Sequence, residues 1–285
     1  MYYEPSTHER VNSTINLQRR KKEAVELAYK TLRLLLWKAG KKHGFEHSKD
    51  ALYKRVGDLL VVIYLWMDCR LGQPPFSATI HIKSANADAL WWDVFDLHKY
   101  KDRPLSSILW EANAAYSHCF CDLPFRLEDW SDAGIKALGI PMGLSIMEAA
   151  EQCIAPFEGS AEKLNEALIQ TTTEAYVPGL RLAQLLAMME LGDYMQPARL
   201  ALADSANTYP PPLFGVGIEK PRAVHIIEYC LAKMKADSAA YPDAQYLPEL
   251  FTGWWDDPLA REWRLDPYKL LPDYFRWIRP DQPRA

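Results

Sequence analysis

The sequence predicts a mainly α-helical protein, a multi-helix bundle with one short β-strand or hairpin near residues 76–84. Two observations carry this prediction. Glycine is scarce, at 13 of 285 residues, whereas tryptophan reaches 10 and apolar residues recur with helical spacing along most of the chain. Few glycines and many large side chains are typical of packed helices. We expect one helical domain over 1–285, or a division into an N-terminal half, 1–130, and a C-terminal half, 144–285.

The N-terminal half is expected to contain four helices and one strand. An amphipathic pattern predicts a helix over 17–39, which Gly40 ends. Ser48 is a suitable N-cap for a second helix that contains the apolar run 59–66, although such a run is also compatible with a buried strand. Apolar and polar residues alternate over 78–83 and predict a strand. The helices expected in this half cover 17–39, 48–70, 86–100 and 104–121.

The C-terminal half is expected to be helical up to a proline-rich tail. Residues 122–143 are expected to be irregular, with one helical turn at 133–138. The segment 241–285 contains seven prolines and ten aromatic residues, so it cannot form one long helix. We expect it to wrap the helical body as short turns held by rings. The helices expected in this half cover 144–154, 160–176, a hairpin at 180–205, and 222–235.

The charge distribution favours a cationic partner. The net charge is -4, but residues 1–47 hold ten Lys or Arg against five Glu, which leaves -9 on the remainder. An acidic surface repels nucleic acid and attracts basic proteins. The basic run 19–22 begins an amphipathic helix and is interpreted as its solvated face. A basic protein is therefore the expected partner, and no nucleic acid is expected.

The cysteines and the N-terminus are typical of a cytoplasmic protein. The five cysteines are an odd number, and three of them lie in apolar segments, which favours buried reduced thiols. No window of 18 residues is free of charge, and residues 1–5 show no signal-peptide pattern. We therefore expect no association with a membrane and a cytoplasmic location.

Metal and cofactor motifs are weak in this sequence. His118, Cys119 and Cys121 are three potential ligands, but no second Cys/His pair stands at zinc-finger spacing. The alternative to a binding protein is a haem-oxygenase-like dimetal enzyme built on a helical bundle. Its candidate ligands are Glu111, His118, His225 and Glu228. Ordered Glu-x-x-His pairs are absent, so we expect no metal or cofactor. The sequence therefore favours a binding protein over an enzyme.

Other catalytic patterns are also incomplete. The chain contains no Gly-x-Ser-x-Gly, and Gly215-Val216-Gly217 lacks the third glycine of a dinucleotide-binding loop. Asp256 and Asp257 precede Pro258, which favours an acidic helix cap over a magnesium pair.

Clustered aromatic residues are the main candidates for a partner-binding surface. Large rings bury much area at low entropic cost and dominate protein interfaces. Two adjacent tryptophans, Trp91 and Trp92, cannot both be expected to face the core of one helix. The candidate partner-binding residues are Trp91, Trp92, Trp130, Trp254, Trp255, Asp256, Asp257 and Trp263. Any functional surface is therefore expected to draw on residues 86–130 or 241–277.

Several segments resemble a known family in their order. An apolar segment ends at Cys69-Arg70-Leu71-Gly72 and is followed by Thr79-Ile80-His81-Ile82, Ala87-Asp88-Ala89-Leu90-Trp91-Trp92 and, later, Asp243-Ala244-Gln245-Tyr246-Leu247-Pro248-Glu249-Leu250. This layout is similar to that of the helical immunity proteins of bacterial polymorphic-toxin systems, in particular the immunity protein 49 family. The resemblance implies a non-catalytic protein that binds a cognate toxin and blocks its active site or substrate path. A tetratricopeptide-like scaffold or chaperone centred on 180–205 is a third hypothesis.

Overall fold

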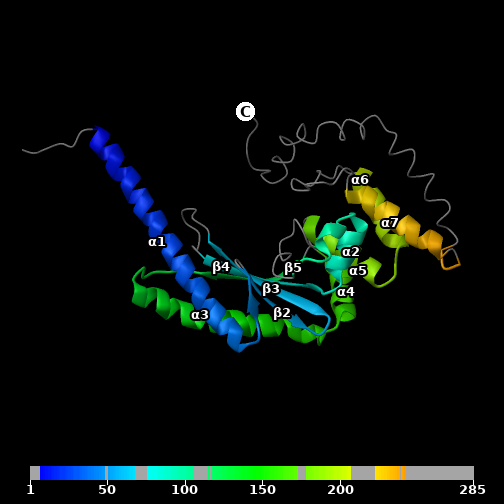
Figure 1. Cartoon of the computed structure of the whole chain (residues 1–285), viewed down its shortest axis with the longest axis horizontal. Helices are drawn as coiled ribbons and strands as arrows, with labels where there is room; N and C mark the ends of the chain where they lie inside the picture. Colours follow the sequence, from blue (N-terminus) through cyan, green and yellow to red (C-terminus); the bar gives the residue numbers. More distant parts are fainter. Residues whose placement is uncertain are drawn as a thin grey trace, which may run out of the picture. The chain divides into compact units, whose positions relative to one another are not determined.

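The computed structural model describes residues 7–48, 51–67, 76–104, 115, 117–172, 178–206, 222–237 and 239–241. The chain divides into two compact units, each built from two segments of the sequence (Figure 1). Unit 1 comprises Met1–Lys83 and His118–Ser160, and unit 2 comprises Ser84–Ser117 and Ala161–Ala285. Each unit is described by itself below.

Unit 1 contains a five-stranded antiparallel sheet, so the prediction of a mainly α fold with one strand or hairpin near 76–84 is wrong. The protein is α+β. The strands lie side by side in the order of the sequence. They are β1 (Glu46–His47), β2 (Ala51–Val56), β3 (Leu59–Met67), β4 (Phe76–Ser84) and β5 (His118–Phe125).

Strands β2 and β3 replace the helix predicted over 48–70. Val56 pairs with Leu59, so Gly57 and Asp58 form a two-residue turn. Only Gly57 has a positive φ there, 58°, which matches a turn with glycine at its first central position. Every residue from Leu59 to Leu65 is buried. Because β3 is covered on both faces, its apolar run has no period of two, and the sequence pattern resembles a buried helix.

Strand β4 confirms the strand predicted near 76–84, whereas β5 overturns the C-terminal part of the helix predicted over 104–121. The fully buried side chains of β4 alternate at Phe76, Ala78, Ile80 and Ile82. Strand β5 pairs with β4, and the register shifts between Ile80 and His81 because Phe120 is an extra residue, a β-bulge. Residues 105–114 of that predicted helix lie outside the described residues.

Two helices, α1 (Thr7–Lys42) and α3 (Asp132–Ile154), pack against each other along the sheet (Figure 1). Their contact is close because α3 places Gly139 and Gly143 against α1. A Cβ at Gly143 would lie 3.0 Å from the Cβ of Ala39, and one at Gly139 would overlap the side chain of Leu35. The Tyr29 hydroxyl on α1 donates to the Leu65 carbonyl on β3 at 2.8 Å.

Helix α3 begins well before the predicted residue 144 and includes most of the segment expected to be irregular. Ser131 caps its N-terminus, since the Ser131 hydroxyl accepts from the Gly134 amide at 3.1 Å. Three glycines and Pro141 argue against a helix at the level of the sequence. Packing of Gly139 and Gly143 against α1 overrides that propensity.

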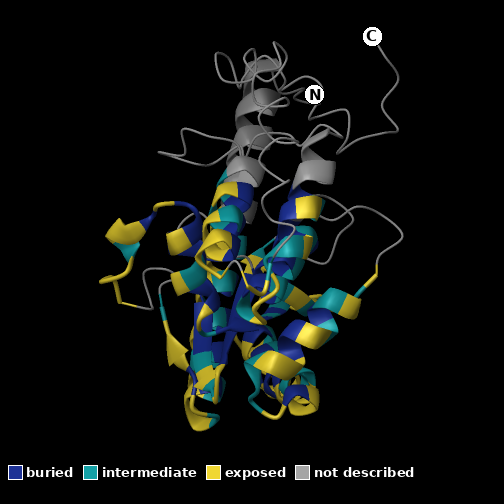
Figure 2. Ribbon diagram, turned by 90° about the vertical axis from the view of Figure 1, so that its right-hand side faces the viewer, coloured by how far each residue is buried: buried dark blue, intermediate teal, exposed yellow. Residues whose placement is uncertain are grey.

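Unit 2 contains the helices that the sequence predicted best. They are α2 (Ala87–Val94), η1 (His98–Tyr100), α4 (Ala161–Gln170), α5 (Pro178–Glu190), α6 (Met195–Ala206) and α7 (Arg222–Ala236). Helix α2 with η1 matches the predicted helix 86–100, α7 matches 222–235, and α5 with α6 forms the predicted hairpin at 180–205. Helix α4 ends at Gln170, earlier than the predicted residue 176, and residues 173–177 lie outside the described residues. In Figure 2 the described helices carry buried and exposed positions on different sides.

Two tryptophans anchor the core of unit 2, and the expectation that they cannot both face inward is wrong. Trp91 is 2% and Trp92 is 6% exposed. Helix α2 packs against both α5 and α7, so its apolar surface extends around more of the helix than one stripe. Both rings belong to one cluster with Leu185, Ile226 and Cys230.

The expected aromatic wrap over 241–285 lies outside the described residues except for Tyr241. Among the described residues, no helix is both long enough and apolar enough to cross a bilayer.

Candidate protein-interaction site

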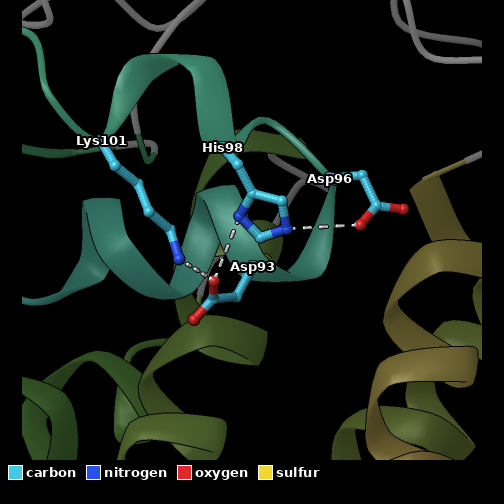
Figure 3. Close-up of polar contacts among 4 residues, drawn as sticks. All are labelled: Asp93, Asp96, His98 and Lys101. Carbon is cyan, nitrogen blue, oxygen red and sulfur yellow. Dashed lines mark hydrogen bonds and ion pairs between the residues drawn. The ribbon is translucent and has the colours of Figure 1, made fainter.

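Four charged or titratable side chains gather at the C-terminal end of α2 (Figure 3). Asp93 Oδ1 accepts from Lys101 Nζ at 2.6 Å and lies 3.6 Å from His98 Nδ1. The other ring nitrogen, Nε2, lies 3.7 Å from Asp96 Oδ1. The imidazole thus stands between two carboxylates, within ion-pairing distance of both when it is protonated. All four side chains are exposed to solvent, so each pair contributes less than about 1 kcal/mol to stability.

The backbone at the end of α2 fixes this arrangement. Asp96 has a φ of 54°, and the Leu97 amide donates to the Trp92 carbonyl at 2.8 Å. This pair of features is a Schellman motif in which aspartate occupies the position that glycine usually takes. The Lys101 ammonium follows the negative end of the helix dipole, which favours a cation there. Leu97 and Trp92 are both buried, which holds the turn against the core.

Three half-buried tyrosines lie beside one another on the same unit. The Tyr194 ring contacts Tyr229 and Tyr241 edge to face, with centroids 6.4 and 6.3 Å apart. The Tyr241 hydroxyl donates to the Gly192 carbonyl at 2.6 Å. On α7, Lys233 Nζ lies 5.2 Å from the centroid of the Tyr229 ring, one turn earlier. The rings therefore have fixed positions while they keep part of their surface exposed.

The pKa of Tyr229 depends on charged and aromatic neighbours from both groups of residues. Burial raises the pKa of Tyr229, Lys233 lowers it, and Tyr194 and Asp93 raise it further. The net shift is upward, so the phenol stays neutral and can donate a hydrogen bond. Asp93 lies on α2 and Tyr229 on α7, and these two helices pack against each other. We call the combined region the α2–α7 surface; it consists of Asp93, Asp96, His98, Lys101, Tyr194, Tyr229, Lys233 and Tyr241.

The acidic excess of the protein belongs to the unit that carries this surface. Unit 2 has 16 Lys or Arg against 22 Asp or Glu, a net charge of -6. Unit 1 has 17 against 15, a net charge of +2. A cationic partner is therefore attracted to unit 2 rather than to unit 1.

A second polar cluster of unit 2 is buried. The Asn165 amide donates to Glu190 Oε2 at 2.7 Å, and Asp88 Oδ1 accepts from the Ala115 amide at 2.7 Å. Burial raises the pKa of Glu190, hydrogen bonds from Asn165 and Ser84 lower it, and the nearby Asp88 raises it; burial dominates. The hydrogen bond between Asp88 and the Ala115 amide holds residue 115 against α2. This contact indicates a structural role for the cluster.

The structure places the predicted partner-binding residues in different environments. Trp91 and Trp92 are core residues with almost no exposed area. Trp130 is 41% exposed, and its ring lies 6.3 Å from that of Phe76 in unit 1. The remaining five candidates, Trp254, Trp255, Asp256, Asp257 and Trp263, lie outside the described residues.

The residues of the metal alternative are spread over both units. His118 lies on β5 in unit 1, whereas His225 and Glu228 lie on α7 in unit 2; Glu111 lies outside the described residues. The His225 ring packs edge to face on Phe95, with centroids 5.6 Å apart. In the described part of the chain, no three His, Cys, Asp or Glu side chains are arranged to hold a metal ion.

Sequence reasoning missed the residues that the α2–α7 surface brings together. Asp93 and Asp96 were within the expected functional segment 86–130, but Tyr194 and Tyr229 were not. One signal in the sequence could have indicated the exposed side of this helix. Ala89, Asp93 and Asp96 are small or polar, and their helical spacing places them on one side of a helix whose other residues are mostly buried. Nothing in the sequence links that side to α7.

In comparisons with known proteins, no family model, no curated protein and no solved structure matches the chain.

Proposed function

We propose that the protein is a non-catalytic binding protein that neutralises a basic toxin by covering its active site or substrate path with the α2–α7 surface. The observation that carries this proposal is the fixed group of half-exposed tyrosines beside exposed carboxylates on the acidic unit. Aromatic anchors supply most of the energy of protein interfaces, and complementary charge accelerates association.

The chemistry of the surface fits recognition of a cationic partner. The Tyr229 phenol offers a hydrogen-bond donor, and the three tyrosine rings offer a large apolar area with few rotatable bonds. Asp93 and Asp96 offer carboxylates to Arg or Lys side chains, and Lys101 shields only one of them. A partner guanidinium that replaces Lys101 at Asp93 gains a bidentate contact that an ammonium group does not make.

Binding to the protein encoded by the adjacent gene tests the proposal. We expect a complex by titration calorimetry and protection of cells that express this neighbour. A silent titration together with no protection would overturn the proposed function.

Variants of the surface locate the interface within such a complex. Tyr194→Ala is expected to weaken binding by about 30-fold, as for an aromatic hot spot. The isosteric double variant Asp93→Asn with Asp96→Asn is expected to slow association by about 10-fold at low salt and to flatten the salt dependence. Glu148→Lys on α3 is the control, because it makes the same change of charge at an exposed carboxylate of unit 1. If only the control weakens binding, the interface lies elsewhere.

A further inference from the structure

A group of thiols in unit 1 has no part in the proposed binding function. Cys119 and Cys121 lie on β5, and Cys153 lies near the end of α3. All three are free, and the structure leaves Cys119 exposed and the other two half-buried. Cys230 in unit 2 is different, since it is fully buried and its pKa is raised to about 12.

Cys121 faces the helices, and the β-bulge at Phe120 turns Cys119 to the opposite face of the sheet. Cys121 pairs with Ile80, whose face of the sheet also carries Phe76, the neighbour of Trp130 just before α3. The bulge residue Phe120 packs on Phe157, just after α3, with ring centroids 5.4 Å apart. Cys121 and Phe120 are both half-buried, whereas Cys119 pairs with His81 and is exposed. Cys121 therefore occupies the helix-covered side of the edge strand.

Helix periodicity places Cys153 on the matching side of α3. It follows the buried residues Ile146 and Met142 by seven and eleven positions, which is two and three helical turns. Helix α3 and strand β5 contact each other, and the Cys121 thiol is among the neighbours that raise the pKa of Cys153. The two thiols therefore lie on facing sides of the contact between α3 and β5.

We infer that Cys121 and Cys153 form a reversible disulfide when the protein meets a peroxide. Strand β5 lies at the edge of the sheet, so a small oxidant can reach Cys121 without unfolding. The bond would fix the edge strand to the C-terminal end of α3. It would also close a long loop of the chain, and a disulfide restricts the unfolded chain more when the loop that it closes is longer.

The chemistry is balanced with hydrogen peroxide as the oxidant. The Cys121 sulfur attacks one peroxide oxygen, the O–O bond breaks, and a sulfenic acid and one water form. The Cys153 sulfur then attacks the sulfenic sulfur; the S–S bond forms, the S–O bond breaks, and the hydroxyl leaves with the Cys153 proton as a second water. Cys121 is the attacking thiol because it lies on the edge strand, which leaves Cys153 as the resolving thiol. Burial and the neighbouring thiols raise the pKa of Cys153, which disfavours its thiolate.

Peroxide treatment of the full chain, in a Cys69→Ser background, tests this inference. Non-reducing peptide mapping by mass spectrometry is expected to find the Cys121–Cys153 linked pair, and the melting temperature is expected to rise by roughly 5–10 °C until a dithiol is added. Cys153→Ser is expected to lose the pair and to leave a dimedone-reactive sulfenic acid on Cys121.

Two further variants test whether the other cysteines take part in the disulfide. Cys119→Ser and Cys230→Ser are each expected to keep the linked pair, because neither thiol takes part in it. A pair between Cys119 and Cys121, a pair between Cys119 and Cys153, or three unmodified thiols after treatment would overturn the inference.

Discussion

The turn between β2 and β3 is expected to be intolerant of any side chain at Gly57. This residue has a φ of 58°, and a Cβ there would overlap the carbonyl oxygen of Gly159. The same carbonyl accepts a hydrogen bond from the Asp58 amide at 2.8 Å. Gly57→Ala therefore affects both the local conformation and the contact between this turn and the segment after α3.

The magnitude follows from three contributions. An alanine in the left-handed region costs about 1 kcal/mol. Moving the Gly159 carbonyl away loses its hydrogen bond with Asp58, about 1 kcal/mol, and straining the two backbone segments costs about 1 kcal/mol more. We therefore expect Gly57→Ala to reduce the free energy of unfolding by about 3 kcal/mol.

Gly44→Ala is the matched control in the same unit. Gly44 has a φ of 78°, but its nearest neighbours are the Cε and Nζ atoms of Lys54, at 3.6 and 3.7 Å, the mobile end of a side chain. Only the conformational cost of about 1 kcal/mol is expected there. Urea unfolding followed by circular dichroism measures both variants. If the two variants lose the same free energy, the close approach of Gly57 to Gly159 is refuted.

Three other perturbations test unit 2 and its surface. Trp91→Ala is expected to cost about 3–5 kcal/mol, whereas Trp130→Ala is expected to cost less than about 1.5 kcal/mol because its ring is partly exposed; urea unfolding compares them. Asp96→Gly is expected to raise stability by about 0.5 kcal/mol, since glycine adopts its positive φ without strain, and a lower melting temperature would count against the Schellman geometry. Because the pKa of Glu190 is raised in the folded state, the folded protein binds more protons and stability falls as pH rises above the ordinary value of 4.5. Glu190→Gln is therefore expected to remove that decline, with no effect at pH values below 4.5, and an unchanged pH profile would contradict it.

Unit 2 shows how far periodicity alone predicts a structure. The helices α2, α5 and α7 were expected from apolar residues at helical spacing, because all three pack into a common core. Local signals such as prolines and glycines also bounded the hairpin of α5 and α6. The positions of Tyr194 and Tyr229 relative to Asp93 were not predictable, since these residues meet only when α2, α6 and α7 pack together.

Unit 1 shows where the same reasoning fails. The Gly57-Asp58 pair between two apolar segments is a hairpin signal, yet the run 59–66 also satisfied a buried helix. Pro141 and three glycines disfavoured α3, whose stability comes from its contact with α1. In both cases the deciding interactions are with residues far away in the sequence.

The sequence by itself determined which residues are apolar and that the chain is acidic outside its first 47 residues. Only the tertiary structure decided that β3 is a strand, that Trp91 and Trp92 are both buried, and that the acidic excess belongs to unit 2. The physical reason is that burial on two faces and the pairing of distant segments are set by neighbours in space, and these neighbours leave no periodic trace in the sequence.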